Sequence, residues 1–374
     1  MCRFIFYLGA PIRLSTIISE PSHSLLVQSL HSSCQSVSLN ADGFGIAWYV
    51  PDITPIPGVF KDITPAWSNI NLRQLARVTK SGCIAAHIRA ASAGAIVNTN
   101  CHPFTFRNFS WMHNGCIPFY NHLKRDIYSM ISDSAFELIK GTTDSELLFA
   151  LFISNYEKEI GYKAEKAKTN GTVYYSTHCA LEPEEKPYPS HVNNTEIIPK
   201  VLQETIFQIH ELLLQYELKN GLLSNNTGSE GNVNGNNGSN GAGASNSCGG
   251  SGSSGNNSPT DLLMEGASLR QTNSCCKLNL AVTDGFTVVA TRYVTGMPEA
   301  AHSLYWSRGS TIKFDDGHCQ LGRSTDSSPH SKSYSESLVI SSEPLASDFQ
   351  CEPVPVNHIV IGNSSGYFSI EPIN

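Results

Sequence analysis

Several features are missing from this chain of 374 residues. It has no uninterrupted apolar run of about 18 residues, which excludes a membrane-spanning helix. It has no excess of positive charge, because its net charge is −7, and this argues against nucleic acid as the main partner. The short apolar run near its start is not followed by an adequate cleavage site, which disfavours a secretory signal peptide.

The chain also lacks any C-x-x-C pair, although it contains 11 cysteines. The odd count and the scattered positions predict free thiols in a reducing compartment, and therefore a cytoplasmic location. Cys275 and Cys276 are adjacent, which suits neither a metal knuckle nor an easy disulfide.

Hydrophobic residues make up 40% of the chain, slightly below the share of about 45–50% in typical globular domains. One insert explains the difference, because residues 220–260 are almost entirely Gly, Asn and Ser. Such a composition cannot bury a core and predicts disorder. Strand-like segments resume beyond the insert, so we expect one domain over residues 2–374 that is interrupted by it.

The expected strands outnumber the expected helices and follow one another in hairpin order. Helices are predicted at 70–78, 142–160 and 195–218, a loop at 51–65, and a turn at 113–115 between two strand-like runs. Strands are predicted at 4–8, 46–50, 83–89, 109–112, 116–119, 278–283, 286–294, 303–307, 337–341 and 355–361. This order favours an α+β fold of stacked antiparallel sheets with helices outside, and not a βαβ alternation.

Cys2 is the first candidate for chemistry. If Met1 is removed, the thiol and a free α-amino group lie on one residue. A thiol attacks as the thiolate, with an ordinary pKa of about 8.5, whereas an α-amino group titrates near 7.7–8.0 and can serve as the base. The alternative is that Cys2 is a small apolar residue that opens a strand.

Two further motifs could serve such a nucleophile. His87 and Arg89 are spaced to lie on one side of a strand, and an arginine can bind a carboxylate through two hydrogen bonds. Asn114 and Gly115 could supply a side-chain amide and a backbone N–H to an oxyanion. The alternatives are a structural salt bridge at Arg89 and an ordinary hairpin turn at Asn114–Gly115.

Two more motifs also have both a functional and a structural interpretation. Asp144 could accept a substrate ammonium group, although an acid at the start of a helix also fits the helix dipole. His87, His102 and His113 have no metal-like spacing, so we expect packed histidines that support the site and no bound metal.

The order of these motifs resembles the class II glutamine amidotransferases, which are N-terminal nucleophile hydrolases. The five matching elements are Cys2, His87-x-Arg89, Asn100-Cys101-His102-Pro103, His113-Asn114-Gly115 and Thr143-Asp144-Ser145-Glu146. The resemblance implies a four-layer αββα sandwich of two antiparallel sheets. Further segments at 21–25, 42–49 and 342–345 resemble a stand-alone branch, which includes a fungal glutathione-degradation subunit and a bacterial hydrolase of ergothioneine biosynthesis.

The resemblance also implies roles for the residues. Cys2 would attack a γ-glutamyl amide, Asn114 and Gly115 would stabilise the oxyanion, and Arg89 and Asp144 would hold the glutamyl carboxylate and ammonium. It implies no cofactor, glutathione as the substrate, and a metallopeptidase-like protein as partner. The alternatives are a glutaminase subunit that passes ammonia to a partner, a hydrolase of another γ-glutamyl compound, and a non-catalytic regulatory subunit.

Overall fold

The computed structural model describes residues 2–30, 39–91, 94–161, 187–188, 193–223, 272–309, 311–315, 318–322 and 337–373. Most of the Gly/Asn/Ser insert predicted at 220–260 lies outside these residues. The single domain over residues 2–374 therefore stays a prediction.

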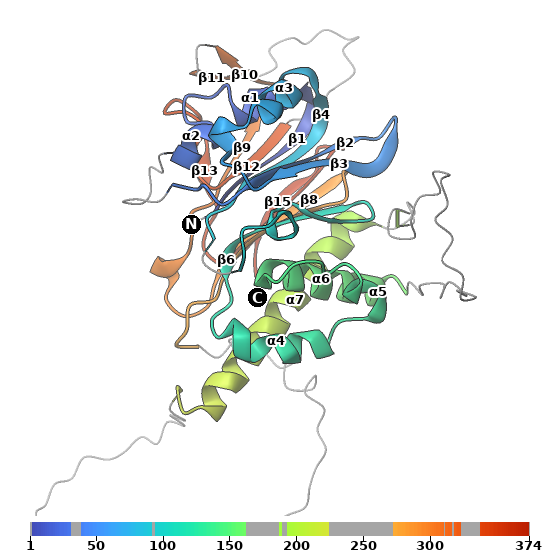
Figure 1. Cartoon of the computed structure of the whole chain (residues 1–374), viewed down its shortest axis with the longest axis vertical. Helices are drawn as coiled ribbons and strands as arrows, with labels where there is room; N and C mark the ends of the chain where they lie inside the picture. Colours follow the sequence, from blue (N-terminus) through green and yellow to red (C-terminus); the bar gives the residue numbers. More distant parts are fainter. Residues whose placement is uncertain are drawn as a thin grey trace, which may run out of the picture.

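Two antiparallel sheets form the centre of the molecule (Figure 1). Sheet 1 has the strand order β13-β9-β12-β1-β4-β2-β3, and sheet 2 has the order β15-β14-β8-β7-β6-β5. The strands of sheet 1 are β1 (Arg3–Arg13), β2 (Phe44–Val50), β3 (Thr54–Asp62), β4 (Lys80–Ile88), β9 (Tyr305–Gly309), β12 (Ser337–Ser341) and β13 (Glu352–Pro353). Those of sheet 2 are β5 (Phe104–Phe106), β6 (Phe109–Cys116), β7 (Lys277–Thr283), β8 (Thr287–Val294), β14 (His358–Asn363) and β15 (Phe368–Pro372).

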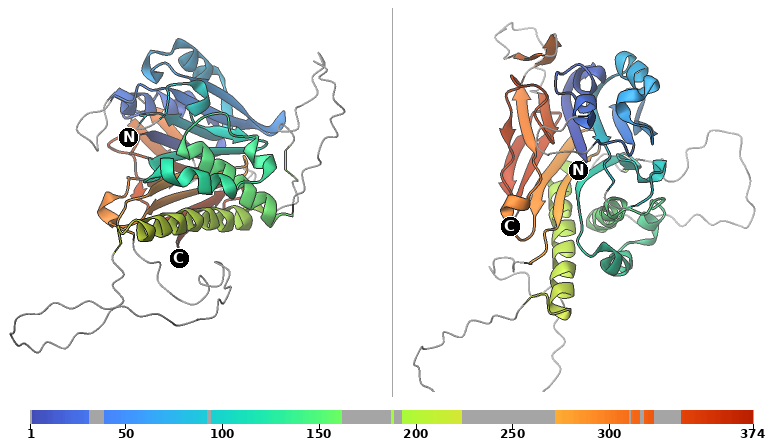
Figure 2. Two further views of the ribbon diagram at one scale, coloured as in Figure 1. Left: turned by 60° about the horizontal axis from the view of Figure 1, so that its bottom comes forward. Right: turned by 60° about the vertical axis from the view of Figure 1, so that its left-hand side comes forward.

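Helices cover the outer face of each sheet, which gives four layers (Figures 1 and 2). The helices are α1 (Ser15–Ile18), α2 (Leu25–Leu30), α3 (Ile70–Val78), α4 (Tyr120–Ser129), α5 (Asp133–Phe136), α6 (Asp144–Glu159) and α7 (Asn194–Lys219). The first three share a core with sheet 1, and α4 to α7 share one with sheet 2. A separate hairpin is formed by β10 (Thr311–Asp315) and β11 (His318–Gly322). The predicted α+β sandwich is confirmed.

Strand alternation explains the three cores. On β1, Phe4 and Phe6 point between the sheets, where they meet Met112 of sheet 2, whereas Ile5 and Tyr7 point toward the outer helices. Burying one such large side chain stabilises the fold by about 1.5–3 kcal/mol. Because β1 is buried on both faces, its sequence is a continuous apolar run and does not alternate between apolar and polar residues.

Three local predictions are wrong. Residues 51–65 are not a loop, because β3 forms there as an edge strand, where the N–H that proline lacks is not needed for pairing. Asn114–Gly115 is not a turn, because β6 continues to Cys116 and pairs with β7 throughout. Residues 117–119 are not a strand, and helix α4 follows them. Among the described helices, none has the length and apolar character needed to cross a membrane.

Candidate active site

The thiol of Cys2 lies against the backbone of Ala90. The Ala90 N–H points at Cys2 Sγ over 3.4 Å, and Sγ lies 3.5 Å from the Ala90 carbonyl oxygen. These contacts form because β1 pairs with β4, with Arg3 opposite Ile88, so the start of one strand meets the end of the other. The predicted nucleophile is therefore placed beside the residue that follows Arg89.

The surroundings of Cys2 keep its thiol protonated. Burial raises the pKa of this thiol above its ordinary value, and the Asp144 carboxylate raises it further. The hydrogen bond from Ala90 and the charge of Arg89 act in the opposite direction and only partly offset burial. Because the thiolate is the nucleophile, a thiol in this position needs a base.

Arg89 is held by its backbone directly after β4. Its N–H donates to the Gly43 carbonyl, and its own carbonyl accepts from the Asp42 N–H. The buried guanidinium donates from Nη1 to the Ala95 carbonyl at 3.0 Å. Asn100 donates to that same carbonyl at 2.9 Å, so Ala95 ties the guanidinium to Asn100. His87 and Arg89 are both buried, but β4 ends at Ile88, so Arg89 lies one residue beyond the strand that was predicted to include it.

Asp144 is the first residue of α6 and is only partly buried. Its Oδ2 accepts from the Ile117 N–H at 3.0 Å and its Oδ1 from the Ser145 N–H at 2.8 Å. Thr143 caps the helix by accepting from the Glu146 N–H at 3.3 Å. The Glu146 carboxylate does not return a hydrogen bond to the Thr143 N–H; it accepts from the Lys140 and Gly141 N–H groups instead.

Asn114 and Gly115 lie on β6, between α6 and sheet 1. The Asn114 side chain is buried, and its Oδ1 has no hydrogen-bond partner among the described residues. Residues two apart on a strand direct their backbone groups to the same edge, and His87 Nε2 donates to the His113 carbonyl at 3.3 Å. The Gly115 N–H therefore faces the edge of β6 that is turned toward β4.

The three predicted histidines are buried and packed around these groups. The rings of His87 and His102 lie 4.2 Å apart, and His113 bonds Ser145 Oγ at 2.9 Å and the Lys277 carbonyl at 3.0 Å. Burial lowers the pKa of His87 to about 3 and lowers that of His102 well below its ordinary value. Both rings are therefore neutral at physiological pH. The described residues contain no cluster of three or more His, Cys, Asp or Glu side chains that could hold a metal ion.

Sequence reasoning missed the contacts that hold the strand of Cys2. Glu343 accepts from Arg3 Nε at 2.6 Å and from His23 Nε2 at 2.7 Å, and the Phe4 N–H donates to Ser342 Oγ at 3.0 Å. The segments at 21–25 and 342–345 were noted only for their resemblance to one branch of the family. Their contact with each other could not be found from spacing, because about 320 residues separate them.

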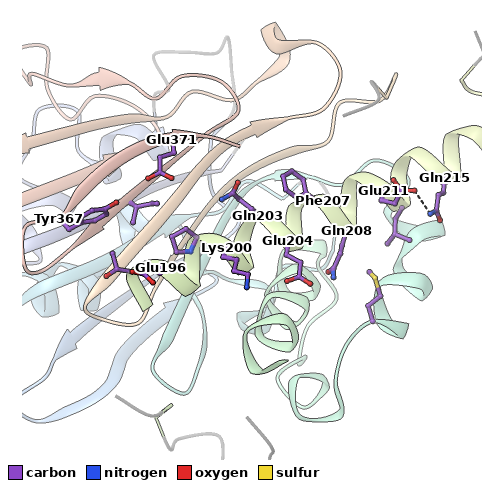
Figure 3. Close-up of a pocket in the computed structure, with 15 residues that line it drawn as sticks. Glu196, Lys200, Gln203, Glu204, Phe207, Gln208, Glu211, Gln215, Tyr367 and Glu371 are labelled. Carbon is purple, nitrogen blue, oxygen red and sulfur yellow. Dashed lines mark hydrogen bonds between the residues drawn. The ribbon is translucent and has the colours of Figure 1, made fainter. Parts of the chain in front are cut away.

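A groove of about 860 Å³ lies along α7, beside strands β14 and β15 of sheet 2 (Figure 3). Side chains of α7 and of the hairpin of β14 and β15 line it, among them Glu196, Phe207 and, in the turn of that hairpin, Tyr367. None of the predicted site residues is among them. This groove is therefore not the site at which Cys2 would act.

Comparisons with known proteins agree with the motif order. Residues 17–178 match the family model described as class-II glutamine amidotransferases. This stretch of the chain is thus a class II glutamine amidotransferase domain. Arg89, Asn114, Gly115 and Asp144 lie inside the matched residues, whereas Cys2 precedes them.

Two curated relatives illustrate the range of similar proteins. The chain is 43% identical over 173 residues to the probable glutamine amidotransferase DUG3 of Saccharomyces cerevisiae, which covers 44% of this chain and 48% of the yeast protein. It is 31% identical over 119 residues to the gamma-glutamyl-hercynylcysteine sulfoxide hydrolase of Mycobacterium tuberculosis, which covers 31% of this chain and 50% of that protein. The chain therefore spans about half the length of the relatives it matches.

Two solved structures are similar to nearly the whole chain, but with low TM-scores and low sequence identity. A glutamine aminotransferase class-II domain protein from Silicibacter pomeroyi has a TM-score of 0.47 and 17% identity, over 99% of both chains. The glutamine phosphoribosylpyrophosphate amidotransferase of B. subtilis also has a TM-score of 0.47, with 11% identity over 100% of this chain and 49% of that one. The fold assignment rests on the strand order of the two sheets and not on these scores.

Proposed function

We propose that the chain is a γ-glutamyl amide hydrolase that uses Cys2 as its nucleophile. One observation carries the proposal: the Cys2 thiol lies against Ala90, the residue after Arg89, and the charges of both Arg89 and Asp144 act on its pKa. A cation and an anion beside a nucleophile suit a substrate with a free α-carboxylate and a free α-ammonium group, which a γ-glutamyl head provides. The mycobacterial relative, by its name, acts on a γ-glutamyl compound.

The mechanism begins with exposure of the Cys2 α-amino group by removal of the residue before it. Cys2 Sγ attacks the δ-carbonyl carbon, and its proton passes to that amino group, directly or through one water. The resulting oxyanion accepts hydrogen bonds from the Asn114 amide and the Gly115 N–H. When the C–N bond breaks, the ammonium group of Cys2 returns the proton to the leaving amine.

Water then attacks the γ-glutamyl thioester, which releases glutamate and restores the thiol. The burial that raises the pKa of Cys2 makes the base necessary, because little thiolate forms without it. No step in this sequence requires a metal or an organic cofactor. The neutral rings of His87 and His102 support the site by packing, and His87 and His113 also form hydrogen bonds to backbone carbonyls.

We propose glutathione as the substrate, with Cys-Gly as the leaving group, and a protein partner of the metallopeptidase type that processes the product. The similarity to a probable glutamine amidotransferase of yeast supports chemistry on a glutamyl amide. It equally suits glutamine as the substrate, with ammonia passed to a partner. Glutathione and glutamine differ only in the leaving group. Arg89 and Asp144 would contact only the glutamyl head, which the two substrates share, so these residues do not distinguish between them.

The test is glutamate release from glutathione, from glutamine and from a γ-glutamyl amide, each with and without added partner proteins. Intact mass is measured first, to show that the residue before Cys2 has been removed. We expect activity that is lost in Cys2→Ala and kept in Cys351→Ala, a matched change at another partly buried free thiol. Activity that survives Cys2→Ala would disprove the site, and activity on glutamine alone would disprove the substrate.

A further inference from the structure

Asn279 lies directly opposite Asn114 on the neighbouring strand. The register of β6 and β7 pairs the two residues, so their side chains share one face with Cβ atoms about 4.5–5.5 Å apart. That face is the one between the sheets, because Met112 and Ala281, two positions away on each strand, pack there against Phe4. Asn279 is fully buried.

The orientation of the Asn279 amide follows from its partners. Its Nδ2 donates to the carbonyl of Ser303 at 3.1 Å and to that of His302 at 3.3 Å. An amide nitrogen has two hydrogens to donate, and these carbonyls use both of them. The amide oxygen must therefore point the other way, and it has no hydrogen-bond partner among the described residues.

The Asn114 amide also lacks hydrogen-bond partners, and it has N–H groups to donate. Its Oδ1 is also buried without a partner, and its side chain forms no hydrogen bond with the described part of the chain. An unsatisfied buried carbonyl oxygen costs about 1–3 kcal/mol. The free oxygen of Asn279 thus lies across from an amide whose two N–H groups are both available.

Asn279 is also connected to the strand that carries Cys2. Ser303, whose carbonyl accepts from Asn279, donates from its Oγ to the Ser342 carbonyl at 2.9 Å. Ser342 Oγ in turn accepts from the Phe4 N–H, two residues after Cys2. Asn279 is therefore one point through which the sheet of Asn114 and the strand of Cys2 are linked by hydrogen bonds.

We infer that Asn279 is a positioning residue that acts through Asn114. When the Asn114 amide turns about its terminal bond, the Asn279 oxygen, which has no partner among the described residues, accepts one of its N–H groups, and the second N–H is directed toward the oxyanion formed on the substrate. The inference rests on the proposed function and extends it to a residue outside the stretch that matches the family model. Because the oxyanion exists only in the transition state, loss of this contact lowers kcat and leaves KM nearly unchanged.

The test compares Asn279→Leu with a matched control, Asn155→Leu. Asn155 is also buried, and its amide donates to Thr205 Oγ1 and Gln208 Oε1 between α6 and α7, away from Cys2. Both variants lose stability, but only Asn279→Leu loses kcat, by about 10- to 100-fold with KM changed less than threefold. If Asn279→Leu does not fold, as judged by circular dichroism, Asn279→Ala takes its place with the same expectation.

A double-mutant cycle with Asn114→Ala identifies the route. If Asn279 acts through Asn114, the double variant has about the kcat of Asn114→Ala alone, whereas independent effects multiply. An active wild-type protein whose kcat is unchanged in the Asn279 variant, or losses that multiply, overturn the inference alone. A processed wild-type protein that hydrolyses no γ-glutamyl compound overturns the proposed function and the inference together.

Discussion

Arg3 and Glu343 form a buried ion pair directly beside the candidate nucleophile. The distance from Arg3 Nε to Glu343 Oε1 is 2.6 Å, and both side chains are almost fully buried. Arg3 Nη1 also donates to the Cys2 carbonyl at 2.9 Å. The pair therefore fixes the backbone of Cys2 to the segment after β12, although 340 residues separate the two partners in the chain.

Removing the charge of Glu343 should loosen the position of Cys2. We expect Glu343→Gln to lower the free energy of unfolding by about 3–5 kcal/mol, because it leaves the Arg3 guanidinium buried without its counter-ion. Urea unfolding measures this loss, and glutamate release measures the accompanying fall in activity. Glu352→Gln, an exposed change on β13, should alter neither; a Glu343→Gln protein as stable as the wild type would contradict the role of the pair.

Binding of the glutamyl head of the substrate should depend on Arg89 and Asp144. We expect Arg89→Lys and Asp144→Asn to raise KM by about tenfold or more, because a lysine cannot bind a carboxylate through two parallel hydrogen bonds and an amide cannot pair with an ammonium group. Steady-state kinetics on a γ-glutamyl substrate measure the effect. Asp133→Asn, in the first turn of α5, serves as the control, and an unchanged KM in Asp144→Asn would refute its role.

A side chain at Gly115 should disturb the strand. A Cβ built there would lie 1.8 Å from the Lys277 carbonyl oxygen, so the backbone must move. We expect Gly115→Ala to cost about 1–3 kcal/mol of stability and to lower kcat, because the Gly115 N–H moves with the backbone. Gly161→Ala, whose Cβ would meet nothing within 4 Å, should retain kcat at a cost of about 1 kcal/mol for its positive φ. A normal kcat in Gly115→Ala would argue against the oxyanion role.

Acid should destabilise the protein through its buried histidines. Burial lowers the pKa of His87 to about 3 and that of His302 to about 4, and it lowers the pKa of His102 well below its ordinary value of 6.5. Below pH 6.5 the unfolded chain binds protons at these residues and the folded chain does not. Each such histidine therefore removes up to about 1.4 kcal/mol of stability per pH unit, from pH 6.5 down to its folded pKa.

His102→Phe isolates one of these contributions. Neither ring nitrogen of His102 has a partner among the described residues, so a phenyl ring leaves no hydrogen bond broken. Urea unfolding at pH 7, 6 and 5 should show a shallower loss of stability than in the wild type, whereas His122→Gln, an exposed change on α4, should keep the wild-type slope. An unchanged slope in His102→Phe would show that His102 does not bind fewer protons in the folded state.

Elements with a continuous apolar pattern could be predicted from the sequence. The strand of Phe4 and the hairpin of β7 and β8 follow from such patterns, helix α3 follows from an amphipathic one, and all are confirmed. Edge strand β3 was missed because prolines normally exclude a strand, and only the sheet order shows that its N–H groups need no partner. The Asn114–Gly115 pair carries the local signal of a hairpin turn, and its pairing with β7 overrides that signal.

Some residues of the candidate site could be predicted from the sequence, and others only from the structure. Local motifs named Arg89, Asn114 and Asp144, because each lies in a short segment with its own chemistry. Contacts across hundreds of residues, such as that between Arg3 and Glu343, leave no mark in local spacing. The partner of Asn114 on β7 could be named only once the register was known, because a single buried asparagine in a strand has no distinctive sequence signal.

Trapping of the covalent intermediate tests the central claim most directly. The processed protein is mixed with a γ-glutamyl substrate, quenched in acid within one turnover, digested and mapped by mass spectrometry. We predict a γ-glutamyl group on the peptide that begins with Cys2, and its absence in Cys2→Ala. A labelled peptide elsewhere, or substrate turnover with no acylated Cys2 at any time, would contradict the account.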